Sequence, residues 1–132
     1  MRAARAILGL FGVIFVGVGL CYLGFPVEGA EIVGIRLDTP MAKADLRAVY
    51  GGLDLAIGLL LLRSARRGEV LVGLRIQVYA FGGLLLGRAL GQTLDSPSNQ
   101  LLVWLVAIEL CGFVSAITAG RRLRSATTLT EQ

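Results

Sequence analysis

The sequence predicts an all-α fold: one polytopic membrane domain over residues 1–132, built as a four-helix bundle with both termini cytoplasmic. Three observations lead to this prediction. A length of 132 residues is the size of a single domain. Hydrophobic residues make up 55% of the chain and charged residues 17%, and the mean hydropathy is +0.75, whereas a soluble domain is about 45–50% apolar and about 25% charged. The apolar residues also gather in four long segments, with most arginines on one side of them.

Each apolar segment is long enough to cross a bilayer, since a helix of about 20 residues spans a hydrocarbon core of about 30 Å. The first segment holds no charge from Ala6 to Val27. This run is long for a signal peptide, so we expect it to remain in the protein as a span. The expected spans are residues 6–25, 46–62, 70–93 and 100–119.

Helix-start and helix-stop residues mark the ends of the later spans. Thr39 followed by Pro40 is typical of an N-cap with proline in the first turn, so the second helix is expected to begin ahead of its span. Ser96 followed by Pro97 gives the same signal ahead of the fourth span, and Gly120 is expected to stop that helix.

The distribution of basic residues predicts the orientation. The loops on one side carry Arg36 and Lys43 against five acidic residues, and most of the 13 basic residues lie on the other side. By the positive-inside rule, both termini therefore face the cytoplasm. No basic face with stacking aromatic residues is predicted, so we expect no nucleic-acid partner. The basic residues on the side of the two termini are Arg2, Arg5, Arg63, Arg66, Arg67, Arg121, Arg122 and Arg124.

Two segments are predicted to lie outside the membrane. The outer loop, residues 26–44, is too apolar for a free linker, with Ile32, Val33 and Ile35 in its middle. We expect it to lie on the outer membrane surface or to cap the bundle. Residues 121–132 are predicted to form a short cytoplasmic tail.

Polar side chains gather at similar depths in the outer half of the predicted bundle. At 1.5 Å per residue, Asp54 lies about 12 Å and Glu109 about 13 Å from the outer ends of their helices, and Arg88 lies about 5–9 Å deep, within reach of either acid. Arg47 is seven residues before Asp54, so the two are expected to share a helix face, with Tyr50 between them. The predicted cluster is Arg47, Tyr50, Asp54, Arg88, Gln92 and Glu109.

Two interpretations of this cluster stay open. In the first, two buried ion pairs hold the helices in register, since the formal charges cancel. In the second, the cluster lines a pocket open to the outer side, which binds a polar headgroup or a small anion beside an apolar tail. Arg75 stands apart on another face, near enough to the cytoplasmic end to snorkel.

Glycines predict close helix packing. Gly83, Gly87 and Gly91 form a small-xxx-small ladder on the third span, which lets another backbone approach closely. The expected partner is the second span, at Gly51 and Gly52, or another subunit.

Patterns of catalytic and metal-binding residues are missing from the sequence. It contains no histidine, which excludes imidazole bases and histidine-ligated zinc or haem. The glycines lie within apolar helices and form no phosphate-binding loop. We therefore assign no catalytic residue, no metal site and no cofactor.

Several short motifs resemble a known family. They are Asp38-Thr-Pro40, Asp45-Leu-Arg-Ala-Val-Tyr-Gly-Gly52, Ala56-Ile-Gly58 and Leu86-Gly-Arg88. With them the chain resembles, from about residue 6 to residue 122, the small four-span bacterial membrane proteins of the domain of unknown function 4345 family, and more distantly the DoxX-like proteins. The resemblance implies a four-helix protein of the bacterial inner membrane and brings no established activity. Arg47, Tyr50, Gly51, Gly52 and Arg88 are the positions that match the family pattern.

Three functions are compatible with these features. The first is a non-enzymatic protein that binds a lipid or lipophilic small molecule or serves as an accessory subunit, with membrane lipids, a second copy or a larger complex as partners. The second is a membrane isomerase or hydrolase that uses Asp54 or Glu109 as acid–base, with Tyr50 assisting. The third is a small proton-coupled exporter in which a poorly paired Glu109 carries the proton.

Overall fold

The structure is a computed structural model that describes residues 1–95 and 100–128. Within these ranges all regular secondary structure is helical and no strand is present, which confirms the predicted fold class. The Ser96–Pro97 signal and residues 129–132 of the predicted tail lie outside the described residues. The elements are α1 (Arg2–Gly24), α2 (Pro26–Ile32), α3 (Pro40–Leu46), the π-helix η1 (Arg47–Leu53), α4 (Asp54–Arg67), α5 (Val70–Asp95) and α6 (Gln100–Thr128).

Four helical stretches are long and apolar enough to cross a membrane, and each overlaps one of the predicted spans: α1, the continuous stretch from Pro40 to Arg67, α5, and α6 as far as Ser125. Many of their large apolar side chains are exposed, among them Leu86 and Val103. Contiguous apolar surface of this extent is unusual in a soluble monomer and normal for a surface that faces lipid. The structure therefore fits a membrane helical bundle.

The second spanning stretch begins as the sequence predicts. Thr39 Oγ1 accepts a hydrogen bond from the Ala42 backbone N–H at 3.1 Å, and Pro40 occupies the first turn of α3. The helix then continues through η1, whose i→i+5 winding the sequence did not predict, into α4. Residues 47–53 therefore present their side chains at angles that an α-helix would not give.

The two helix ends marked by glycine behave differently. Gly68, with φ of 81°, ends α4 in the left-handed region that glycine adopts without strain. Gly120 was predicted to stop the fourth helix, but α6 continues through it to Thr128. The prediction is wrong because Gly120 does not take a positive φ, and the arginine, leucine and alanine residues after it are good helix formers.

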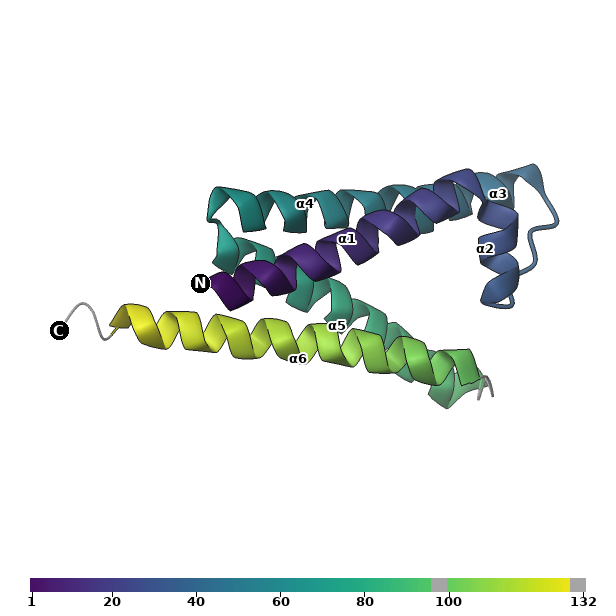
Figure 1. Cartoon of the computed structure of the whole chain (residues 1–132). Helices are drawn as coiled ribbons and strands as arrows, with labels where there is room; N and C mark the ends of the chain where they lie inside the picture. Colours follow the sequence, from purple (N-terminus) through teal and green to yellow (C-terminus); the bar gives the residue numbers. More distant parts are fainter. Residues whose placement is uncertain (96–99, 129–132) are drawn as a thin grey trace.

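The helices are arranged as two pairs, α1 with η1 and α4, and α5 with α6. Figure 1 shows the pairs lying together near the N-terminus and diverging toward the end that carries α2 and α3. We call these the terminal end and the loop end of the bundle. The wedge between the pairs is therefore widest at the loop end.

The α1–α4 pair depends on glycines. A Cβ atom built on Gly19 would lie 2.6 Å from the backbone nitrogen of Leu55, and one on Gly58 would lie 2.7 Å from that of Val16. Gly12 is also tight, because its added Cβ would lie 2.8 Å from the Leu62 side chain. Such close backbone approach is a common way for helices to associate in lipid, where hydrophobic burial does not drive association.

The predicted ladder on the third span has no packing partner in the part of the chain that the structure describes. At Gly83, Gly87 and Gly91, an added Cβ would meet no described atom within 4 Å. The expectation that the ladder packs against the second span is therefore wrong. Gly51 of that span packs against Leu23 of α1, and Gly52 lies close only to its own helix. The α5 face remains open.

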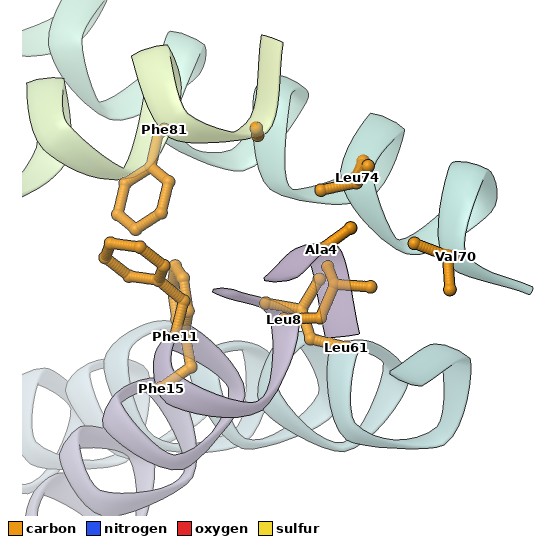
Figure 2. Packing of buried hydrophobic residues seen from close by; sticks show 9 residues of the cluster. Ala4, Leu8, Phe11, Phe15, Leu61, Val70, Leu74 and Phe81 are labelled. Carbon is orange, nitrogen blue, oxygen red and sulfur yellow. The ribbon is translucent and has the colours of Figure 1, made fainter. Parts of the chain in front are cut away.

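The buried core joins the two pairs in the half of the bundle near the N-terminus (Figure 2). The ring of Phe81 on α5 lies edge-on to Phe11 of α1, with centroids 5.1 Å apart, and 5.3 Å from Phe15. Gly112 of α6 lets this ring approach, since an added Cβ would overlap the Phe81 ring. Leu8 and Leu61 are fully buried beside it.

The predicted outer loop is mostly helical. It folds as the short α2, an extended connection and α3. Tyr22, near the end of α1, donates a hydrogen bond from its hydroxyl to the Gly29 carbonyl at 3.3 Å and so holds α2 against α1. Residues Val33 and Ile35 face a cavity between the helix pairs. Both expectations for this loop, a position on the outer membrane surface or a cap on the bundle, stay predictions.

We expect Gly19→Ala to destabilise the protein by about 1–3 kcal/mol, because its Cβ would force the α1 and α4 backbones apart. Gly17→Ala is the matched control on the same helix, since its Cβ would meet open space. Alanine favours helix by about 0.5–1 kcal/mol over glycine, so this control is expected to be neutral or slightly stabilised. Thermal unfolding in detergent, followed by circular dichroism, measures both. Equal stability of the two variants would contradict the glycine contact.

Candidate functional site

The best-defined polar contact of the structure is an ion pair between Arg88 of α5 and Glu109 of α6. Nε of Arg88 donates to both carboxylate oxygens at 2.8 Å, and its Nη2 lies 2.8 Å from Oε1. The glutamate side chain is 7% exposed and the arginine side chain 29%. Glu109 is thus covered, while part of the guanidinium remains accessible with N–H groups that this contact does not use.

The sequence placed Arg88 within reach of either Asp54 or Glu109, and the structure shows that Glu109 is its partner. Because α5 and α6 are neighbours, two side chains at similar depth on facing sides can meet. Arg88 thus balances an acidic group that would otherwise be costly within a membrane. The predicted second pair is not formed, since the carboxylate of Asp54, half-buried on α4, makes no hydrogen bond or ion pair with any residue in the described ranges.

Arg47 does not compensate for this acid. Its Nε donates to the Leu23 carbonyl at 3.1 Å and joins η1 to the end of α1. The expectation that Arg47 and Asp54 share a face assumed α-helical winding, and the π-helix between them changes the angle from one residue to the next. Among the residues that the structure describes, one buried ion pair is present instead of the expected two.

Two tyrosines come together where α1 meets η1. The rings of Tyr22 and Tyr50 lie 5.3 Å apart at 40°, and Tyr22 is within electrostatic range of Asp54 and Arg88. Tyr22 was not among the site residues predicted from the sequence. A search for aromatic residues at the depth of Tyr50 would have found it, since α1 places it near the outer end of the first span.

A cavity of about 250 Å³ lies between the helix pairs at the loop end, and we call it the outer cavity. Its polar lining residues are Tyr50 and Arg88, and the rest of its wall is aliphatic. The chain connection after α2, η1, α5 and α6 all contribute to it. The lining residues are Val33, Ile35, Tyr50, Arg88, Leu101, Leu102 and Leu105.

The predicted cluster is thus brought together in part. Tyr50 and Arg88 line the outer cavity. Glu109 does not line it but forms the ion pair with Arg88. Gln92 is exposed on α5, and Asp54 and Arg47 do not line the cavity. The compact site is therefore Tyr50, Arg88 and Glu109.

The buried amide of Gln77 was also not predicted from the sequence. Gln77 of α5 is fully buried in the core, where its Nε2 donates to the Gly112 carbonyl at 3.0 Å, while its Oε1 has no hydrogen-bond partner among the described atoms. The predicted cluster was built from the ionisable residues within the spans and took in uncharged polar residues only at their depth. A lone amide in the middle of an apolar span was the signal that could have revealed it.

Four long apolar helices, a lipid-facing surface and a buried ion pair define the class: a small multi-pass membrane helical bundle. Within this class, the chain belongs to the family of the domain of unknown function DUF4345, whose sequence pattern matches residues 3–119. No curated protein and no solved structure matches the chain. The more distant DoxX-like resemblance stays a prediction.

We expect Arg88→Ala to cost about 3–5 kcal/mol, because it leaves the covered Glu109 carboxylate without its partner. Glu109→Gln should cost less, since the amide oxygen still accepts a hydrogen bond from Arg88 and the charge that loses its partner is the guanidinium, whose side chain is 29% exposed. Unfolding in detergent gives both values, with the exposed Arg63→Ala as control. If Arg88→Ala were as stable as the unmodified protein, the ion pair would have no structural role.

Proposed function

We propose that this protein is non-enzymatic and binds a lipophilic small molecule in the outer cavity, with the polar head of the molecule against Arg88 and Tyr50. The observation that carries the proposal is the make-up of the cavity. Two hydrogen-bond donors lie in an otherwise aliphatic wall between the diverging helix pairs. Small-molecule sites are typically apolar hollows with a few placed polar groups. The volume of about 250 Å³ suits a polar head and the start of an apolar tail.

The charge of the site indicates which kind of polar head the bound molecule has. Glu109 already balances the charge of Arg88 through short contacts to Nε and Nη2. An anionic head would add an excess negative charge at low dielectric, which is costly. The remaining guanidinium N–H groups and the Tyr50 hydroxyl instead suit an uncharged acceptor, such as a carbonyl or hydroxyl oxygen.

The two alternative functions have less support. An exporter would need a poorly paired Glu109, whereas Arg88 holds this carboxylate in a short ion pair. A membrane isomerase or hydrolase would need an acid beside its substrate, and neither Asp54 nor Glu109 lines the outer cavity.

We further infer that the terminal end faces the cytoplasm of a bacterium and that the protein lies in the inner membrane. The arginines in the first turns of α1, in the last turns of α4 and in the last turns of α6 support this orientation through the positive-inside rule. An accessory role with a second copy or another subunit is part of the proposal, and the open face at Gly83, Gly87 and Gly91 supports it.

The test is native mass spectrometry of the full chain, extracted in mild detergent with its own lipids. We expect a bound molecule in the unmodified protein. Leu105→Trp, which fills the outer cavity, should abolish its retention. Tyr50→Phe, which removes one donor, should weaken it by about fivefold, as expected for the loss of about 1 kcal/mol from one hydrogen bond.

Val103→Trp is the matched control, because Val103 is exposed on the same helix and does not line the cavity. It should retain the molecule fully. A protein with nothing bound, or equal retention by both tryptophan variants, would refute the outer cavity as a binding site and leave the accessory role as the better explanation.

A further inference from the structure

A second cavity of about 250 Å³ lies at the other end of the α5–α6 pair, and we call it the terminal groove. It differs from the outer cavity in its charge. Arg75 of α5 and Arg121 and Arg124 of α6 all line it, and none of the described residues that line it is acidic. Its remaining wall is mainly apolar. The α5–α6 pair therefore combines a dense positive charge with a surface that faces lipid.

The two arginines nearest the membrane are available for a ligand. Arg75 and Arg121 are both exposed, and in the described part of the chain neither side chain makes a hydrogen bond or an ion pair. Arg88, only about 20 Å away along α5, is instead neutralised by Glu109. On α5, the charge of Arg88 is thus balanced by Glu109, whereas the charge of Arg75 is available to an external anion.

The depth of the terminal groove corresponds to the boundary of the membrane. Arg75 lies about 7–8 Å from the start of α5, and Arg121 follows directly on the expected fourth span. Tyr79, one turn further along α5, also lines the groove and is 78% exposed. Arginine and tyrosine are residues that anchor in the headgroup region while their apolar parts lie along the chains.

We propose that the terminal groove binds an anionic phospholipid, with its phosphate on Arg75 and Arg121 and an acyl chain along Val78 and Ile117. A guanidinium group binds phosphate through paired, charge-assisted hydrogen bonds, which an ammonium group cannot reproduce. Basic pockets between spanning helices on the cytoplasmic side are sites of this kind for acidic headgroups. The apolar wall is the reason to assign a lipid and not a free phosphate ion. This proposal does not depend on the outer cavity.

The experiment titrates the purified full chain in neutral detergent with phosphatidylglycerol or phosphatidylcholine of identical acyl chains and counts bound lipid by native mass spectrometry. We expect the unmodified protein to bind phosphatidylglycerol at least tenfold more tightly. Arg75→Gln with Arg121→Gln should weaken this binding by about 30-fold, about fivefold for each arginine. The single variants should each lose about fivefold, and they serve as the test if the double variant loses its helical content.

Arg66→Gln with Arg67→Gln is the matched control, because it removes two exposed arginines at the same end of the bundle that do not line the groove. We expect its affinity to stay within about twofold, as for surface charge that makes no direct contact. An equal loss in both double variants would show attraction by net charge alone and overturn the proposal. It would also be overturned by equal binding of the two lipids, or by displacement of phosphatidylglycerol with millimolar inorganic phosphate.

Discussion

The arrangement of the bundle depends on the close contact of α1 with the η1–α4 stretch. Without glycine at positions 19 and 58, the two backbones could not approach to the distances found. Lipid supplies no hydrophobic force between helices, so such contact has to come from shape. Once this pair is fixed, the second pair joins it through Phe11, Phe15 and Phe81 in the half near the N-terminus. The helices are then free to diverge at the loop end, and the outer cavity follows from that divergence.

Two arginines on α5 show how the surroundings decide the chemistry of one side chain. Arg88 lies between the pairs, where an unpaired charge is costly, and Glu109 of the neighbouring helix balances it. Arg75 lies near the membrane boundary, where it needs no internal partner. The first arginine therefore offers hydrogen-bond donors without net charge, and the second offers net charge. This difference is the reason why we propose different ligand chemistry for the two cavities, an uncharged acceptor in one and an acidic headgroup in the other.

Part of the candidate site could be predicted from depth alone. Arg88 and Glu109 lie at similar depth on helices that are adjacent in sequence, and such helices usually pack together. Asp54 was predicted to find a partner by the same argument and does not, because depth says nothing about the angle around the helix axis. The π-helical turn at Arg47–Leu53 adds to this error, since no residue in it marks the change of winding. Gln77 was missed because it carries no charge.

The sequence by itself determined the number of spans, their approximate limits, the Thr39 cap and the all-helical fold. These properties are local: a long apolar run must form its own hydrogen bonds within a bilayer, whatever its neighbours are. Only the tertiary structure decided which glycines are contacts and which face is open. The ladder at Gly83, Gly87 and Gly91 was the more regular pattern, yet Gly12, Gly19 and Gly58 make the contact. Which face of a helix meets another backbone depends on the packing of the whole bundle, which no local pattern contains.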